Sequence, residues 1–319
     1  MKKFFILCSI LLVSYGAFSQ NDTLLKKLDS LEKKTDSAGG QINNTTPAAY
    51  NEATDLNFRT FFILQGSNLK RAFTKPFHMT GNDWKTIGKF ALITGALAFA
   101  DEPIQKFALD LRNNNKGLRD VSAVVTNFGG SYEGYTLGAL GIYGFLFKNK
   151  KMQTTTLLAL QSYITGAAVE SVVKLISGRQ RPFSVNQNSV DAEPTFKGPF
   201  NKSYDAQGHK LNSSFPSGHT TVAFAAATVY ALEYKDKPWV PILCYTSASL
   251  IGLSRITENK HWATDVLVGA ALGYLTGRQV VNNYHRYAKL KAPKQQKNSV
   301  SFSFNYEAGH LMPGMVYKF

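Results

Sequence analysis

The sequence predicts an all-α fold, a bundle of about six core helices followed by a short C-terminal β-hairpin. From Trp84 to about Ala288, leucine, alanine, glycine and aromatic residues dominate, in apolar runs separated by charged joints. Residues of this kind favour helices, and no run keeps the polar–apolar alternation of a half-buried strand. These changes in composition divide the chain into residues 1–19, 20–85, 86–288 and 289–319.

The first segment, residues 1–19, predicts a signal peptide. Two lysines precede the apolar stretch 4–13, and residues 17–19 form a small-x-small cleavage site. An uncleaved anchor helix is the alternative. We therefore expect export to the cell envelope, with the mature chain in the periplasm and either docked on a membrane or embedded in it.

The segments that flank the bundle differ in character. Residues 20–85 are polar with one weak leucine stripe, and they predict a tether with an amphipathic lead-in. Residues 289–319 start as a basic segment, alternate from Ser301 to Tyr306, and are then interrupted by Gly309 and Pro313. This pattern predicts a β-hairpin, which we expect to pack on the edge of the bundle.

Six apolar runs mark the predicted core helices: Phe90–Ala100, Leu137–Phe147, Thr154–Ile176, Val222–Leu232, Trp239–Leu253 and Val266–Leu275. A helix of about sixteen residues is roughly 24 Å long, so helices that run up and down bring their ends to two levels. The segments around Lys174, Ser217 and His261 then fall at the same end. We expect the functional site there.

The chain has a formal net charge of +15. Such an excess favours anionic partners, such as phosphate esters or an anionic membrane surface. No nucleic-acid-binding module is recognisable, and we expect no nucleic-acid partner.

The environment of the bundle has two interpretations. Basic residues gather at the end opposite the predicted site, as in membrane proteins with basic cytoplasmic loops: Lys148, Lys150, Lys151, Lys235, Lys237, Arg278 and Arg286. Against spanning, most apolar runs are shorter than the ~20 residues that cross a bilayer. If residue 20 is exported, three crossings would also place the site on the cytoplasmic side. We favour a docked periplasmic domain, and a polytopic membrane protein is the alternative.

The first of three charged clusters contains Lys174, Arg181 and Pro182. Lys174 and Arg181 are about two turns apart, so both can lie on one side of a continuing helix, which the proline then stops. A guanidinium group can bind two phosphate oxygens at once. The pair is either a phosphate-binding site or a solvated basic helix end.

The second cluster, Pro216-Ser217-Gly218-His219, precedes a helix of small residues. Ser217 can cap that helix, and Gly218 lets the backbone approach an anion closely. The first N–H groups of the helix attract negative charge, and His219 lies within reach of the same anion. The alternative is a capped helix with a surface histidine.

The third cluster joins Ser254 and Arg255 to His261 and Asp265. His261 and Asp265 are four residues apart and hence neighbours on one helical face. A carboxylate bound to one ring nitrogen fixes the tautomer and frees the other nitrogen to attack. A structural His–Asp pair is the alternative. Together the three clusters suit attack on a phosphate ester without a metal.

In this order, the motifs Lys-x6-Arg-Pro, Pro-Ser-Gly-His and Ser-Arg-x5-His-x3-Asp resemble those of the type 2 phosphatidic acid phosphatase family. Its superfamily also includes bacterial acid phosphatases and vanadium haloperoxidases. The resemblance covers about residues 86–288 and implies a metal-independent phosphatase without a cofactor. Phosphate monoesters, chiefly lipid phosphates or lipid diphosphates, are the expected substrates. A broad-specificity soluble acid phosphatase and a vanadium haloperoxidase are the alternatives.

The resemblance also implies the role of each motif residue. His261 would attack phosphorus and become a phosphohistidine, oriented by Asp265, while His219 would protonate the leaving alkoxide. The phosphate oxygens would be held by Lys174, Arg181, Ser217, Gly218 and Arg255. Between the first two motifs, residues 183–215 form either a lid that selects the head group or a disordered surface loop.

Overall fold

The computed structural model describes residues 50, 54–199, 201, 203–204, 208, 210–291, 299–307 and 310–318. The predicted signal peptide, residues 1–19, and the leucine stripe of the tether lie outside these residues.

The body of the protein is helical, as the sequence predicts. The described residues form α3 (Phe58–Thr74), η3 (Lys75–His78), α4 (Gly81–Ala98), α5 (Asp101–Asn114), α6 (Lys116–Phe128), α7 (Ser131–Leu146), α8 (Lys150–Ser177), α9 (Gly218–Glu233), α10 (Trp239–Thr257) and α11 (Ala263–Lys291). The six predicted runs lie within or largely within α4, α7, α8, α9, α10 and α11. The sequence analysis missed α3, α5 and α6, which lack an uninterrupted apolar run.

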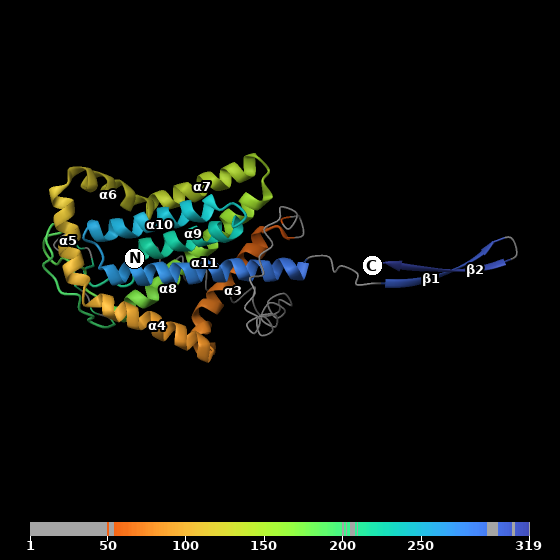
Figure 1. Ribbon diagram of the computed structural model, residues 1–319, viewed down its shortest axis with the longest axis horizontal. Helices are drawn as coiled ribbons and strands as arrows, with labels where there is room; N and C mark the ends of the chain where they lie inside the picture. The colour runs from red at the N-terminus through yellow and green to blue at the C-terminus, as the bar shows by residue number, and fades with distance from the viewer. Residues whose placement is uncertain are drawn as a thin grey trace.

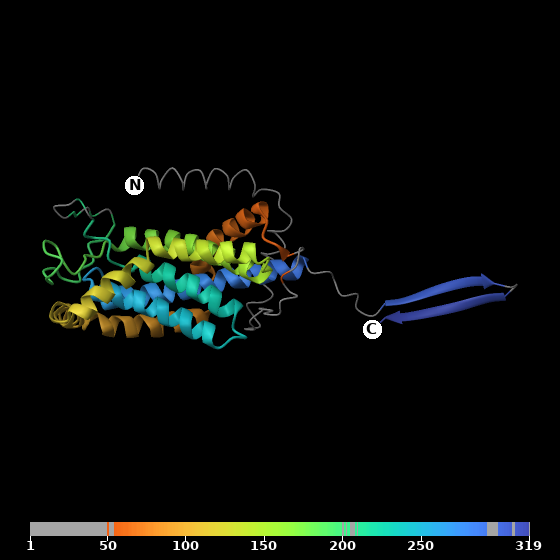
Figure 2. The ribbon, with the colours of Figure 1, turned by 90° about the horizontal axis from the view of Figure 1, so that it is seen from above.

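Helix α9 is the centre of the bundle and packs against α8, α10 and α11 (Figures 1 and 2). Figure 1 shows α5 lying across one end of the long helices, at the left of the view. The loop that joins α8 to α9 and the turn between α10 and α11 reach that same end. The long helices therefore present three separate stretches of sequence at one level.

Local sequence fixes where the long helices begin and end. Thr80 and Asp83 form a capping box at the start of α4, and the Asn149 side chain accepts a hydrogen bond from the Met152 N–H at the start of α8. Gly178 ends α8 in the left-handed conformation, with φ of +53°. A side chain there would be strained, so glycine sets the point where the chain leaves the bundle for the site.

Helices α9 and α11 pack closely because α11 carries three glycines at four-residue spacing. A Cβ atom added to Gly269, Gly273 or Gly277 would lie 2.2 to 2.7 Å from a backbone oxygen at the start of α9 or along it. Real Cβ contacts are longer, so these positions require glycine. The close approach holds the start of α11 beside the start of α9.

Helix α3 joins the bundle through buried polar contacts. Gln65 donates a hydrogen bond to Thr165 Oγ1 of α8 at 3.1 Å, and Asn283 of α11 donates to Asn68 Oδ1 at 2.8 Å. Because these groups are buried and paired, α3 is part of the helical body. The body therefore starts before residue 86, the boundary expected from composition.

The tail contains two antiparallel strands, β1 (Ser299–Glu307) and β2 (His310–Lys318). Their register pairs Ser299 with Lys318 and Glu307 with His310. Figures 1 and 2 show the two strands apart from the bundle, whereas the sequence analysis expected them on its edge. Pairing between the strands satisfies their facing backbone groups without the helices.

The outer helices expose an unusual amount of apolar surface. Helix α4 has no buried residue; Leu92 within it is 75% exposed, and Phe99 at its C-cap is 91% exposed. Phe145 of α7 is 74% exposed. By length and composition, α8 and α10 could each cross a membrane. These two helices extend beyond the apolar runs from which they are predicted.

Candidate active site

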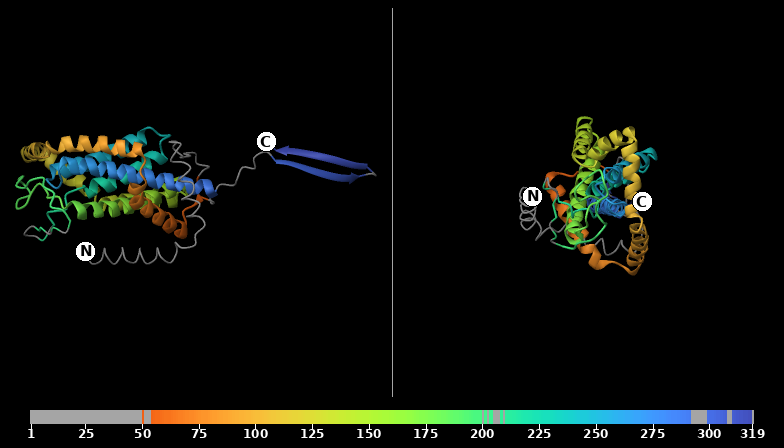
Figure 3. Two further views of the ribbon diagram at one scale, coloured as in Figure 1. Left: turned by 90° about the horizontal axis from the view of Figure 1, so that it is seen from below. Right: turned by 90° about the vertical axis from the view of Figure 1, so that its left-hand side faces the viewer.

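The three charged clusters lie on segments that end where α5 crosses the bundle, the end that faces the viewer in the right-hand view of Figure 3. Lys174 lies in the last turn of α8, His219 in the first turn of α9, and His261 in the turn between α10 and α11. His261 is within electrostatic reach of four of the predicted groups, namely Arg181, Arg255, Lys174 and His219. Segments nearly ninety residues apart in the chain therefore share one site.

His261 is buried, with 2% of its surface exposed, and its ring is held in one orientation. Nδ1 lies 2.7 Å from the backbone carbonyl oxygen of Ser214. A carbonyl only accepts hydrogen bonds, so Nδ1 carries the proton and donates it. Nε2 is then the unprotonated nitrogen, and its lone pair is available for attack.

The sequence analysis expected Asp265 to bind the His261 ring directly, and the structure corrects this. Asp265 Oδ2 is 3.6 Å from His261 Nδ1, beyond hydrogen-bond distance. It accepts instead from the Ser214 hydroxyl and, at 2.9 Å, from the Trp262 N–H. Asp265 therefore positions Ser214, whose carbonyl positions His261.

Asp265 belongs to a buried ionic network that sequence spacing could not reveal. Arg179 donates to Asp265 Oδ1 and to Asp101 Oδ2, each at 2.6 Å. Asp101, the first residue of α5, also accepts from the Thr264 N–H at 2.9 Å. Arg179 and Asp101 are 78 residues apart, so only the packing of α5 across the bundle end brings them together.

The predicted cations surround His261 in different settings. Lys174 forms an ion pair with Glu170, one turn earlier in α8. Arg255 donates to the Thr126 hydroxyl, while its buried Nε has no hydrogen-bond partner in the described part of the chain. Arg181 donates to the Lys260 carbonyl at 3.3 Å. Arg255 thus keeps a donor for an incoming anion.

Gly218 lies directly against a charged side-chain pair. A Cβ atom at this position would lie 2.6 Å from Glu170 Oε1 and 3.2 Å from Lys174 Nζ. The start of α9 can approach this ion pair only because residue 218 has no side chain. Glu170 is a site residue that the sequence analysis missed, although its spacing of four from Lys174 gives a signal.

Ser217 does not cap α9 as expected. It stands at the N-cap position, but its side chain makes no capping hydrogen bond. Its hydroxyl accepts from Thr220 Oγ1 at 2.8 Å, and its N–H donates to the Asp265 carbonyl at 3.0 Å. The side chain therefore leaves the first N–H groups of α9 uncapped, as a helix start that binds an anion requires.

His219 faces the turn between α6 and α7. A Cβ atom added to Gly130 in that turn would lie 3.1 Å from His219 Nε2. Burial, and then repulsion from Arg255, Lys174 and Arg181, lowers the pKa of His219 to about 3. Burial and the same cations hold the pKa of His261 well below its ordinary value. Both rings are neutral at pH 7.

The loop between α8 and α9 is built against the site. Asp191 accepts hydrogen bonds from the N–H groups of Val185 and Asn186 at 3.1 Å. Asn259, two residues before His261, donates to the Gln187 and Ser189 carbonyls at 2.8 and 2.7 Å. These contacts tie the described part of the loop to the turn that carries His261, so this part is a packed wall.

The site can thus present the lone pair of a neutral imidazole to an electrophilic substrate. Several cations around that ring can bind the negative charge of the same substrate. His219 can exchange a proton on the side of α6 and α7. Among the described residues, the carboxylates of Asp265 and Glu170 at the site are each paired with a cation. This arrangement fits nucleophilic attack on an anionic centre such as phosphorus.

Comparison with known proteins shows the family to which the chain belongs. Residues 155–289 match the model of the PAP2 superfamily. The chain is 31% identical over 193 residues to phosphatidylglycerophosphatase B of Bacillus subtilis. The matched region covers 58% of this chain and 83% of that protein. It is 56% identical over 66 residues to the lipid A 1-phosphatase of Porphyromonas gingivalis. This shorter matched region covers 20% of this chain and 15% of that protein.

A lipid phosphate phosphatase of Arabidopsis thaliana is 31% identical over 177 residues, 47% of this chain and 53% of that protein. The chain therefore spans only part of the length of several of these relatives. A transmembrane PAP2-type phosphatidylglycerolphosphate phosphatase from Bacillus subtilis superposes on 74% of this chain and 94% of its own, with 22% identity and a TM-score of 0.41.

Proposed function

The chain belongs to the PAP2 superfamily, and from that membership we propose that it is a phosphatase of lipid phosphates or lipid diphosphates that works through a phosphohistidine. The observation that carries the proposal is the state of His261. Its Nδ1 proton is bound by the Ser214 carbonyl, which leaves the Nε2 lone pair inside a ring of cations. The names of the matched relatives support lipid phosphates as the substrate class.

In the first step, His261 Nε2 attacks phosphorus and forms a P–N bond while the bond from phosphorus to the leaving oxygen breaks. The departing oxygen takes a proton from His219. Burial and then the neighbouring cations keep His219 neutral before substrate binds. The negative charge of the bound phosphate offsets those cations, so that the ring can take up a proton from water. Substrate binding thus provides the condition under which His219 can hold the proton it donates.

In the second step, water attacks the phosphohistidine and the P–N bond breaks, which releases inorganic phosphate and restores His261. His219 accepts the proton of that water, as microscopic reversibility requires. Throughout, Lys174, Arg181 and Arg255 stabilise the charge on the phosphoryl oxygens, and the uncapped N–H groups of α9 add to them. In this scheme, fixed cations take the place that a metal ion has in other phosphatases.

The exposed apolar surface supports a membrane setting for this chemistry. Large apolar side chains on α4, α7 and α10 face outward, which is unfavourable in water over so wide an area. We infer that these helices contact lipid and that the protein takes its substrate from a membrane. Export to the periplasm, as the N-terminal sequence predicts, is part of the same proposal.

The test is phosphate release by the purified full chain in detergent, with and without EDTA. The panel contains phosphatidic acid, a lipid diphosphate and a soluble aryl phosphate. We expect activity that persists in EDTA, with higher kcat/KM on the lipids. Loss of activity in EDTA would contradict the metal-free scheme, and equal kcat/KM on the aryl phosphate would favour a broad-specificity acid phosphatase.

A further inference from the structure

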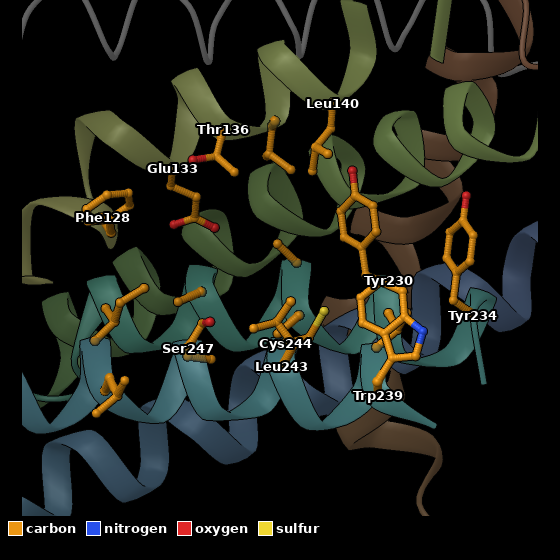
Figure 4. Close-up of a pocket in the computed structure, with 18 of the residues that line it drawn as sticks. Phe128, Glu133, Thr136, Leu140, Tyr230, Tyr234, Trp239, Leu243, Cys244 and Ser247 are labelled. Atoms are coloured by element: carbon orange, nitrogen blue, oxygen red, sulfur yellow. The ribbon is translucent and has the colours of Figure 1, made fainter. Parts of the chain in front are cut away.

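An apolar groove of about 700 Å³ lies between α7, α9 and α10, outside the phosphate site. Figure 4 shows α7 along one side of it and α10 along the other. Its lining is almost wholly hydrocarbon, with Val125 and Phe128 towards the site and Trp239 and Lys237 towards the far end. Its length and lining suit a hydrocarbon chain.

The groove begins directly beside His219. Ile251 lines the groove, and a Cβ atom on Gly129 would lie 2.5 Å from Ile251 Cγ2 and 2.9 Å from His219 Cβ. Only the glycine turn separates the groove from the ring that faces the phosphate. A lipid with its phosphate at His261 could therefore lay a chain in the groove.

One polar side chain of this lining, Glu133, is buried without a hydrogen-bond partner among the described residues. Glu133, in the first turn of α7, is 7% exposed, and Figure 4 shows its carboxylate directed into the groove. Neither carboxylate oxygen has a hydrogen-bond partner within the described residues. Glu133 follows Gly130, the neighbour of His219, by three residues, or about 4.5 Å along a helix. It therefore lies near the phosphate end of the groove.

An unpartnered buried carboxyl group is unfavourable unless a ligand completes its hydrogen bonds. Burial raises the pKa of Glu133 to about 8, so the group is a neutral acid at pH 7. A neutral carboxylic acid presents one O–H donor and one carbonyl acceptor side by side. The complementary ligand group is one that also donates and accepts, which is a property of hydroxyls and amides but not of esters.

We propose that the groove binds a chain of the lipid phosphate substrate and that Glu133 selects lipids with an amide or hydroxyl group close to the phosphate. This inference rests on the proposed function. It adds a specificity-determining residue outside the phosphate site, and it distinguishes amide-linked lipid phosphates from ester-linked ones.

The experiment compares kcat/KM of the full-length protein in detergent on three substrates. Ceramide 1-phosphate carries an amide and a hydroxyl, phosphatidic acid of matched chain length carries only esters, and p-nitrophenyl phosphate has no chain. The variants are Glu133→Leu, Glu133→Gln and, as a matched control in the same groove, Thr136→Ala. Thr136 is exposed and donates its hydroxyl to the Tyr132 carbonyl of its own helix.

We expect the wild type to prefer ceramide 1-phosphate, and Glu133→Leu to reduce that preference by about tenfold or more. Glu133→Gln, which retains a donor and an acceptor, should preserve most of it, and Thr136→Ala all of it. Turnover of p-nitrophenyl phosphate should stay unchanged in every variant, which also shows that each variant folds.

Two results would overturn the inference while leaving the proposed function intact. One is an unchanged lipid preference in Glu133→Leu. The other is an equal loss on all three substrates, which would indicate a structural role. Wild-type protein that hydrolyses none of the three would instead refute the proposed function, and the inference with it.

Discussion

The backbone carbonyl of Ser214 fixes the His261 ring, with the carbonyl oxygen 2.7 Å from Nδ1. The hydroxyl of the same serine donates to Asp265, which Arg179 also binds. The proposed nucleophile, His261, is thus oriented through a loop backbone that a buried ionic network holds in place. Asp265, a residue of the family motif, is thus linked to the His261 ring through Ser214.

The first prediction concerns this indirect support. Asp265→Asn removes the charge that binds Arg179 and weakens the contact with Ser214, so the His261 ring shifts. We expect kcat to fall about a hundredfold with little change in KM, as for a misplaced reacting group. Ser214→Ala keeps the carbonyl and should lose less, about tenfold. A larger loss in Ser214→Ala than in Asp265→Asn would contradict this order of support.

The second prediction concerns stability. Arg179 is 1% exposed and pairs with two buried aspartates. Arg179→Met leaves both carboxylates buried without their cation, which typically lowers the free energy of unfolding by about 3–5 kcal/mol. Thermal unfolding in detergent measures the loss. Arg119→Gln is the control, because that side chain is 46% exposed and should change stability by less than about 0.5 kcal/mol.

The third prediction concerns pH. In the proposed mechanism His261 attacks as the neutral imidazole, and burial with the neighbouring cations lowers its pKa from the ordinary value of 6.5. The neutral form therefore persists as pH falls below 6.5, and activity is lost only when pH falls through the lowered pKa. We expect the acidic limb of log kcat/KM, corrected for ionisation of the substrate, to lie below pH 6.5. A limb at or above 6.5 would contradict the lowering of the His261 pKa by burial and the neighbouring cations.

The fourth prediction concerns the glycine at the start of α9. Gly218→Ala places a methyl group 2.6 Å from Glu170 Oε1, so the Glu170–Lys174 pair must move away from the phosphate site. We expect kcat/KM to fall at least about tenfold. Gly138→Ala is the matched control, since its added Cβ meets nothing within 4 Å. Equal activity in the two variants would mean that the ion pair is not part of the site.

Much of this molecule could be predicted from sequence because its signals are local. The apolar runs have helical composition, and the motif around Gly218 and His219 opens a helix where its residue types predict. Convergence of the clusters was predicted from helix length together with an up-and-down arrangement of the helices. The C-terminal strands were also predicted from a local alternation. Local alternation carries no information on where the strands lie relative to the bundle.

The remaining features depend on packing between distant segments. Asp101 and Arg179 meet only because α5 crosses the end of the bundle, and no spacing in the chain encodes that crossing. The His261–Ser214 contact uses a backbone carbonyl, which every residue type has, so residue identity carries no signal for it. Glu133 was missed because a single acid beside an apolar run looks like a solvated helix start.

The most direct test of the central claim is to trap the phosphorylated enzyme. Wild-type protein is mixed briefly with ³²P-labelled substrate, quenched in alkali and mapped by mass spectrometry, with His261→Ala in parallel. The account predicts an alkali-stable, acid-labile phosphoryl group on Nε2 of His261 and none in the variant. A phosphoryl group on any other residue, or full turnover by His261→Ala, would contradict it.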